Sequence, residues 1–465
     1  MLPGDLPESA FKELGVDLDK LRISTASHAT ARASPNLLHA TPLSRDEPPP
    51  GAPSIVLYAE ILLHIRTATL FGSLRTGKTH DTKARLSTDA TCITVSYEGE
   101  SATLRLPMKV KGGGSAVVEI PAEPPNKDIS VRLEVEEREG SSFFTGAHSD
   151  ERKANVVPWD AVSLNEMKTL SVLCRHCQSP VVGTGRVTEW RDLPNENWAE
   201  MMDFWHCHKP DEHHLHDHAH HETFSKKGYA AGSRLKAIQS IGFIDLASFL
   251  LSEQDCEGVQ SGARSSDSPR NLLTCKACSH VLGVLDEQAS GWRVWKWALS
   301  IGAAGPSLPS ASPAHSAHTY SIQKWISARL LFLIENLGIR KFHVHADTDG
   351  ASVPSLLIWV FTPDLLFSSS VPSHKEPRND PTRAMKIFYQ KKEWSPPKPG
   401  EAEPASVEEV SFPQELFDEL HSALEESQQL LPVSARRFQG WDVGLLERFD
   451  VGEDNRARQH NNEQA

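Results

Sequence analysis

Two C-x-x-C pairs are the strongest chemical signal in the chain: Cys174 with Cys177, and Cys275 with Cys278. Two thiolates separated by two residues can bind one metal ion from a tight turn, and two such knuckles complete a tetrahedral zinc site. The pairs stand 97 residues apart, so the fold must bring them together, unless they are two unrelated pairs of buried thiols. Because four thiolates leave no coordination position open for water, the spacing predicts a structural Zn²⁺ ion.

A second group of ligating or nucleophilic side chains is the run Trp205, His206, Cys207 and His208. It lies where a predicted helix ends, shortly before Pro210. Carbonyl groups point outward at a helix C-terminus, so the helix does not lower the pKa of the thiol, although the two imidazoles can. Three interpretations are open for Cys207: a catalytic nucleophile, a ligand in a metal site, or a small apolar residue beside Trp205.

Residues 72–79 match the pattern of a phosphate-binding loop, with Gly77, Lys78 and Thr79 in place. Such a loop joins a strand to a helix. The residues that follow show no helical periodicity and soon return to a strand pattern. The segment is therefore predicted to be a hairpin turn and not a site of nucleotide hydrolysis.

Two histidine-containing segments also have ligating side chains. His343, His345 and Asp347 alternate along a predicted strand, similar to the H-x-H-x-D-H motif of metallo-β-lactamase-fold hydrolases, but the sixth position is Thr348. The motif is interpreted as the solvated face of a strand. The His-rich run at 211–222 can bind transition metals, as any such tract can, and is predicted to be a disordered insertion.

The hydrophobic pattern places these motifs in an α+β fold. Repeated alternation of apolar and polar residues predicts a β-rich, sandwich-like N-terminal domain. Amphipathic stripes predict helices at 322–337, ended by Gly338, and at 413–430. The predicted divisions are a flexible lead-in at 1–53, the β-rich domain at 54–163, a zinc-knuckle region with the W-H-C-H run and the His-rich loop at 164–300, a C-terminal α+β region at 319–449 and a disordered tail at 450–465.

The composition excludes several classes of partner. The 465 residues include 48 Lys and Arg against 61 Asp and Glu, which gives a net charge of −13. An acidic balance argues against a basic nucleic-acid footprint and against an anionic membrane surface. No apolar run approaches the roughly 18 residues of a membrane-spanning helix, and the start has no secretory signal pattern. We therefore expect a soluble intracellular protein that binds neither nucleic acid nor membrane directly.

The chain has two knuckles, a segment between them that reads ENW and then D-x-W-x-C-H, and a strand-rich, cysteine-poor end. Together these features resemble the HECT-like ubiquitin-conjugating-enzyme-binding proteins. The resemblance covers residues 160–450. It implies a cytoplasmic and nuclear ubiquitin-protein ligase or ligase adaptor, which binds a ubiquitin-conjugating enzyme charged with ubiquitin and promotes proteasomal degradation.

The same resemblance implies an alternative function in messenger-RNA 3′-end processing. In the family, the W-x-C-H segment is regarded as inserting into the active site of the cleavage and polyadenylation endonuclease. On this chain the partner-binding residues would then be Trp205, His206, Cys207 and His208. The alternative is a non-catalytic inhibitor or chaperone of that endonuclease.

The cysteine positions limit the mechanism that the resemblance implies. A HECT-type ligase takes ubiquitin as a thioester on a cysteine of its C-terminal lobe, because a thiolate exchanges readily with another thioester. No cysteine follows Cys278 in this sequence. If a thioester forms, Cys207 is the first candidate, ahead of Cys92 and Cys256. Direct transfer from the bound conjugating enzyme fits better, and a zinc-stabilised interaction module without transfer activity is a third reading.

Overall fold

The fold is described from a computed structural model of the chain. Several predicted segments lie outside the described residues. They are the run Trp205–His208, the His-rich run at 211–222, and the predicted lead-in and tail except for Pro53 and Asp450. The described residues are 53–62, 67–77, 82–111, 117–118, 127–136, 157–167, 170–193, 235–262, 271–303, 317–347, 352–373, 378–396 and 406–450.

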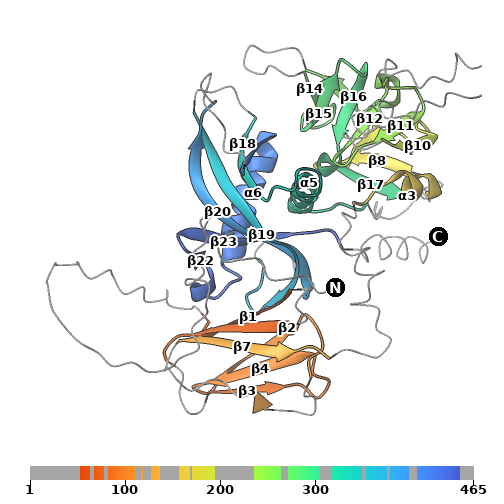
Figure 1. Cartoon of the computed structure of the whole chain (residues 1–465). Coiled ribbons are helices and arrows are strands. Elements are labelled where there is room, and N and C mark those ends of the chain that lie inside the picture. The colour runs from red at the N-terminus through yellow and green to blue at the C-terminus, as the bar shows by residue number, and fades with distance from the viewer. Residues whose placement is uncertain are drawn as a thin grey trace, which may run out of the picture. The chain divides into compact units, whose positions relative to one another are not determined.

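A nine-stranded sheet joins strands from both ends of the described sequence (Figure 1). β1 (Ile55–Leu62) pairs antiparallel with β19 (Val353–Ser369), which pairs in turn with β20 (Thr382–Trp394). Beyond β1 follow β2 (Thr67–Leu74) and β7 (Asp128–Glu134), and beyond β20 follow β23 (Trp441–Glu447) and β22 (Arg437–Phe438). β18 (Lys341–Ala346) pairs with β19 and with β21 (Glu408–Phe412).

The alternating segments near the N-terminus form strands in two layers, which we call the sandwich. Its first layer is β1, β2 and β7, and its second layer is a four-stranded sheet in the order β5-β4-β3-β6. Leu57 and Leu70 from the first layer are buried in one apolar cluster with Ile93 and Val95 from the second. Because β1, β2 and β7 also belong to the nine-stranded sheet, the sandwich shares that sheet with the C-terminal strands. The second-layer strands are β3 (Lys83–Leu86), β4 (Cys92–Tyr97), β5 (Glu100–Arg105) and β6 (Val117–Val118).

The central region contains two smaller sheets, after a short helix α3 (Ala161–Glu166). One has three strands in the order β17-β8-β9, and the other has seven in the order β10-β11-β12-β16-β15-β14-β13. Their bounds are β8 (Leu170–Cys174), β9 (Pro180–Val182), β10 (Glu189–Asp192), β11 (Ile241–Ile244), β12 (Ser248–Leu251), β13 (Val259–Ser261), β14 (Leu272–Cys275), β15 (Val281–Asp286), β16 (Gly291–Trp295) and β17 (Leu299–Ala303).

Both long helices lie where the periodicity predicts them. α5 (Ile322–Leu337) ends at Gly338, whose φ of 69° is left-handed and suits a residue without Cβ. α6 (Gln414–Gln428) packs against β18, β21 and β23 (Figure 1). The α6 side chains buried there are Leu416, Phe417, Leu420, Ala423 and Leu424.

A buried ion cluster lies where β19, β20 and β23 meet. The Arg383 guanidinium donates to both carboxylate oxygens of Asp364, at 2.8 and 2.9 Å. Arg448 Nη1 lies 3.2 Å from Asp364 Oδ1 and donates to the carbonyl of Pro363 at 2.7 Å. The two arginine side chains are only 4% and 5% exposed. One carboxylate therefore serves two guanidinium groups that have little access to water.

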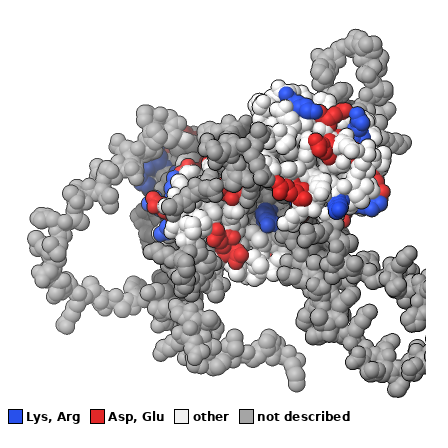
Figure 2. All heavy atoms as spheres, turned by 90° about the horizontal axis from the view of Figure 1, so that it is seen from above, with Lys and Arg blue, Asp and Glu red and all other residues white. Residues whose placement is uncertain are grey.

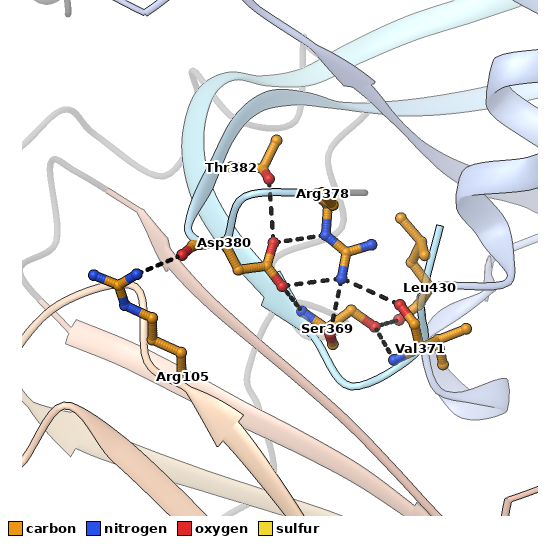
Figure 3. Close-up of polar contacts among 7 residues, drawn as sticks. All are labelled: Arg105, Ser369, Val371, Arg378, Asp380, Thr382 and Leu430. Carbon is orange, nitrogen blue, oxygen red and sulfur yellow. Dashed lines mark hydrogen bonds and ion pairs between the residues drawn. The ribbon is translucent and has the colours of Figure 1, made fainter. Parts of the chain in front are cut away.

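The turn between β19 and β20 is tied to other elements by a second network (Figure 3). Arg378 donates to both carboxylate oxygens of Asp380, at 2.6 and 2.9 Å, and to the carbonyl of Ser369 at 2.7 Å. The Ser369 hydroxyl donates to the carbonyl of Leu430, just after α6. Arg105 of β5 donates to the carbonyl of Asp380 at 3.1 Å. The turn thus connects the C-terminal strands, the end of α6 and the sandwich.

The phosphate-loop segment differs from the sequence-based expectation. Residues 72–74 of the phosphate-loop pattern lie inside β2, and the next described element is the strand β3. Because β2 and β3 pair in different sheets, the predicted hairpin turn is wrong, and the segment connects the two layers of the sandwich.

The sequence pattern predicts that the histidines of β18 lie on a solvated face. The structure does not place them on such a face. His345 is 5% exposed, its Nε2 lies 3.0 Å from Glu409 Oε1, and its ring stacks on Trp394. His343 Nε2 lies 2.9 Å from the Ser355 hydroxyl. His345 is buried because the Trp394 ring covers it, whereas His343 is half-buried. Within the described segments, they belong to no group of three metal-ligating side chains.

None of the described helices combines the length and the apolarity needed to cross a membrane. On the face shown in Figure 2, Lys and Arg are interspersed with Asp and Glu, and the described residues there form no large patch of one sign.

Candidate zinc centre

Four cysteine side chains meet between the three-stranded and the seven-stranded sheets. Their Sγ atoms all lie within 4.8 Å of one another. Cys174 Sγ is 3.8 Å from Cys278 Sγ, and Cys177 Sγ is 3.6 Å from Cys275 Sγ. Both distances join opposite knuckles and are far longer than the roughly 2.05 Å of a disulfide. The fold therefore brings together the four thiols that the sequence predicts as ligands.

The first knuckle is the turn between β8 and β9. The Cys174 N–H donates to the carbonyl of Ser179 at 2.9 Å, and the Gln178 N–H donates back to the carbonyl of Cys174 at 2.8 Å. Gln178 closes the turn with a left-handed φ of 59°. These two bonds fix a tight loop that presents both thiols toward the second knuckle.

The second knuckle, between β14 and β15, repeats this pattern. The Cys275 N–H donates to the carbonyl of His280 at 2.9 Å, and the Ser279 N–H donates to the carbonyl of Cys275 at 2.8 Å. Ser279 has a φ of 61°, at the position equivalent to Gln178. The equivalence between two turns so far apart in sequence indicates that both are shaped for the same task.

The four thiols fit a tetrahedral Zn²⁺ ion. With Zn–S bonds of about 2.3 Å, a regular tetrahedron places its sulfur atoms about 3.8 Å apart, close to the 3.6 and 3.8 Å between opposite knuckles. Cys174 and Cys275 are buried, and Cys177 and Cys278 are half-buried. Four thiolates close the coordination shell, so an ion held here would link the two sheets and activate no water.

The thiols of one knuckle ionise at very different pH values. Burial raises the pKa of the Cys174 thiol to about 12. A hydrogen bond from the Ser179 side chain lowers the pKa of Cys177 to about 6. At neutral pH the Cys177 thiolate is thus available, whereas a cation has to displace a proton from the buried Cys174 thiol.

Neighbouring side chains connect the knuckles to the C-terminal part of the chain. Arg175 Nη1 donates to the carbonyls of Trp297 and Tyr320, both at 3.2 Å, just before α5 begins. The rings of His176 and His280 stack with centroids 5.5 Å apart. The knuckle region therefore contacts the segment that leads into α5.

Sequence reasoning missed the residues that close the two turns. Left-handed positions are usually sought at Gly or Asn, and here they are Gln178 and Ser279. The hydrogen bonds that shape the turns are made by the backbone of the residues that follow each knuckle, so no side-chain type in the sequence signalled them.

The remaining cysteines have different surroundings. Cys256 is 1% exposed, and burial followed by the charges of Asp255 and Glu253 raises the pKa of its thiol. It is therefore a poor nucleophile. Cys92 is half-buried in β4, with Sγ 3.8 Å from the Thr91 hydroxyl. Cys207, together with Trp205, His206 and His208, lies outside the described residues.

Comparison with known proteins adds a family to this geometry. Residues 60–443 match the model of the family described as HECT-like ubiquitin-conjugating enzyme (E2)-binding. An uncharacterized protein of Schizosaccharomyces pombe is 27% identical over 301 residues, which are 63% of this chain and 78% of that protein. An uncharacterized protein of Saccharomyces cerevisiae is 25% identical over 287 residues, 61% of this chain and 71% of that protein. No solved structure matches the chain.

Proposed function

The chain belongs to the family of HECT-like ubiquitin-conjugating enzyme (E2)-binding proteins, and from this premise we propose that it binds a charged E2 and promotes ubiquitin transfer to substrate proteins. The family match carries the proposal, because it spans both knuckles and most of the nine-stranded sheet. Proteasomal degradation of the substrates and action in the cytoplasm and nucleus belong to the same proposal.

The inventory of thiols favours a scaffolding mechanism over a covalent one. Four cysteines are drawn into the candidate zinc centre, Cys256 is buried with a raised pKa, and no cysteine follows Cys278. In direct transfer, a substrate lysine amine attacks the thioester carbonyl on the E2. An isopeptide bond forms, the C–S bond breaks, and the E2 thiol leaves. The chain then has only to position the two reactants.

The zinc centre has a supporting role in this proposal. Cys174, Cys177, Cys275 and Cys278 would hold the ion, and a four-thiolate site supplies cross-linking rather than reaction chemistry. It would fix the central sheets beside α5, through contacts such as those of Arg175.

A discharge assay tests the proposal. The purified chain is mixed with an E2 charged with fluorescent ubiquitin, and free lysine is the acceptor. We expect faster loss of the E2 thioester and no reductant-sensitive ubiquitin adduct on the chain, measured by non-reducing gel and intact mass. An adduct lost in Cys207→Ala but kept in Cys92→Ala would instead establish a covalent ligase. Unchanged discharge despite measured E2 binding would contradict the ligase proposal for that E2.

The same variants test the alternative function. An inhibitor or chaperone of the 3′-end processing endonuclease would act through Trp205–His208, because imidazole and thiolate are ligands that a metal site accepts. Cys207→Ala should then abolish endonuclease binding, while scaffolded ubiquitin transfer should continue. Binding that survives the substitution would exclude that mode of inhibition.

A further inference from the structure

An aromatic surface crosses four neighbouring strands of the nine-stranded sheet. Trp359 of β19 lies directly opposite Phe388 of β20, and Phe438 of β22 lies opposite Trp441 of β23. The rings touch in a continuous series, with Phe361 stacked on Phe388 at 4.7 Å and Phe388 5.3 Å from Phe438. We call these five side chains the aromatic face.

The aromatic face is more exposed than such side chains usually are. Phe361 is 44% exposed and Phe438 is 45% exposed, whereas Phe388 beneath them is 5% exposed. Trp359 and Trp441 are half-buried at the sides. Large aromatic side chains gathered on a surface, around a ring that they shield, are typical of protein interaction sites.

Phe361 lies two residues after Trp359 and therefore on the same face of β19, beside a break in strand register. Val360 lies opposite Ile387 and Thr362 lies opposite Lys386, so Phe361 is an extra residue with no partner on β20. Such bulges re-aim a side chain and are frequent beside functional sites. The bulge leaves Phe361 outside the regular ladder of β19 and β20, on the same face as Trp359.

The other face of the same strands is occupied by the protein's own core. Ile387 and Met385 of β20 belong to the cluster that contains the buried residues of α5 and α6, whereas Phe388 belongs to a separate cluster. Figure 1 shows α6 beside these strands. The sheet is thus covered by helices on one face, and exposed rings remain on the other.

Basic side chains border the aromatic face. Lys341 Nζ lies 5.2 Å from the centre of the Trp359 ring. Arg437, next to Phe438, is 81% exposed and lies 3.0 Å from Asp442. A partner that matches this surface would present apolar side chains with acidic groups at the edge.

We propose that the aromatic face is the surface on which the chain docks the E2, with Phe361 and Phe438 as the central contacts. This inference rests on the proposed function, since E2 binding supplies the partner class. The occupant is the E2 itself and not ubiquitin, a second copy of the chain or another segment of it. Exposed aromatic anchors over a rigid sheet provide the buried contacts that carry most of the affinity in protein interfaces.

Binding of uncharged E2 tests the surface, because ubiquitin is then absent. A panel of purified E2s is titrated against the full chain by calorimetry. We expect Phe361→Ser and Phe438→Ser each to weaken binding at least about tenfold. Leu337→Ser is the matched control, because Leu337 is 45% exposed and lies at the end of α5. The control should bind as tightly as the unaltered chain, with the same melting temperature for all.

The outcomes distinguish a wrong assignment of the surface from a wrong proposal of E2 binding. If the unaltered chain binds an E2 and both variants bind it equally well, the surface assignment is wrong and E2 binding stands. If no E2 of the panel binds the unaltered chain, both proposals fail. If the unaltered chain is a dimer by light scattering and the variants are monomers with normal E2 affinity, the aromatic face is a self-association surface and the proposal is overturned.

A charge reversal gives an independent readout. Lys341→Glu together with Arg437→Glu should lower the association rate for the same E2 about tenfold at low salt, with a smaller difference at high salt. An association rate that is unchanged, or that increases, would contradict an acidic partner surface.

Discussion

The central region and the nine-stranded sheet hold their strands together in different ways. In the central region the longest strand, β15, has six residues, and four cysteines meet between its two sheets. In the large sheet β19 has 17 residues and β20 has 13, and they pair along nearly their whole length. Short strands provide few hydrogen bonds and little buried surface each. The comparison indicates that the first region relies on a cross-link, whereas the second relies on pairing and can leave aromatic rings exposed.

The largest effect should come from breaking the cross-link. Cys275→Ser removes one of the four thiolates, so zinc content should fall from about one ion per chain to nearly none and the free energy of unfolding should drop by more than about 4 kcal/mol. Metal analysis and chemical denaturation measure both. Amide exchange should accelerate in β8 and β14 far more than in β19 and β20.

Cys92→Ser is the matched control for this prediction, because that half-buried thiol lies in the sandwich and outside the cluster. It should keep the zinc content and nearly all of the stability. A cysteine cluster that retains no metal in the unaltered chain, or an equal effect of both variants, would contradict a cross-linking role.

The converse experiment breaks the large sheet and spares the centre. Asp364→Asn keeps the shape of the side chain but leaves the buried Arg383 and Arg448 without their shared carboxylate. The cost should be about 3–5 kcal/mol, measured by denaturant unfolding, because an uncompensated buried charge remains. Zinc content should not change. Asp442→Asn, whose partner Arg437 is 81% exposed, should cost less than about 1 kcal/mol.

A smaller loss of stability is expected when the Asp286 carboxylate of the central region is removed. Burial opposes the ionisation of Asp286, but the Ala289 N–H and the Arg293 guanidinium outweigh it and hold its pKa below 3.8. Asp286→Asn should therefore cost about 2 kcal/mol at pH 7.

The pH dependence of this variant has a definite sign. Because the pKa of Asp286 is lower in the folded state than its ordinary value of 3.8, its contribution is fully present above that pH and is lost as the pH falls through the folded-state pKa. Unfolding measured between pH 7 and pH 3 should show a constant difference that shrinks only below about pH 4. A difference that grows with acidification would contradict this assignment.

The smallest effect concerns α5, which follows the central sheets and leads into the large one. At the left-handed Gly338, a Cβ would meet no atom within 4 Å, so Gly338→Ala tests backbone conformation alone. The loss should be about 1 kcal/mol, measured by thermal unfolding. Gly338→Asn should lose less, since Asn tolerates this conformation. Equal losses would show that the cap does not govern the stability of α5.

Features that depend on local pattern were predictable from the sequence. The helix at 322–337 has an apolar stripe and a terminal glycine, and the β18 segment alternates, so both elements are found at the expected residues. The knuckles were predictable as a group of four because spacing restricts what thiols can bind. Zinc itself stays a prediction.

Features that depend on distant partners were not predictable. Nothing in the sequence around His345 shows that Trp394 covers its ring, so a buried side chain was expected to be solvated. The pairing of β1 with β19 joins residues about 300 positions apart, which no local period encodes. The aromatic face was missed for the same reason, because its rings come from four separate strands.

The pairing of β1 with β19 also has a consequence for synthesis on the ribosome. The strand Ile55–Leu62 is made about 300 residues before its partner Val353–Ser369. At about 5–20 residues per second, one edge of β1 waits roughly 15 to 60 seconds for its neighbour. During that interval the nascent sandwich presents an unpaired strand edge, a known template for aggregation. A chaperone that shields this edge would matter more for this chain than for one whose sheets are assembled from neighbouring segments.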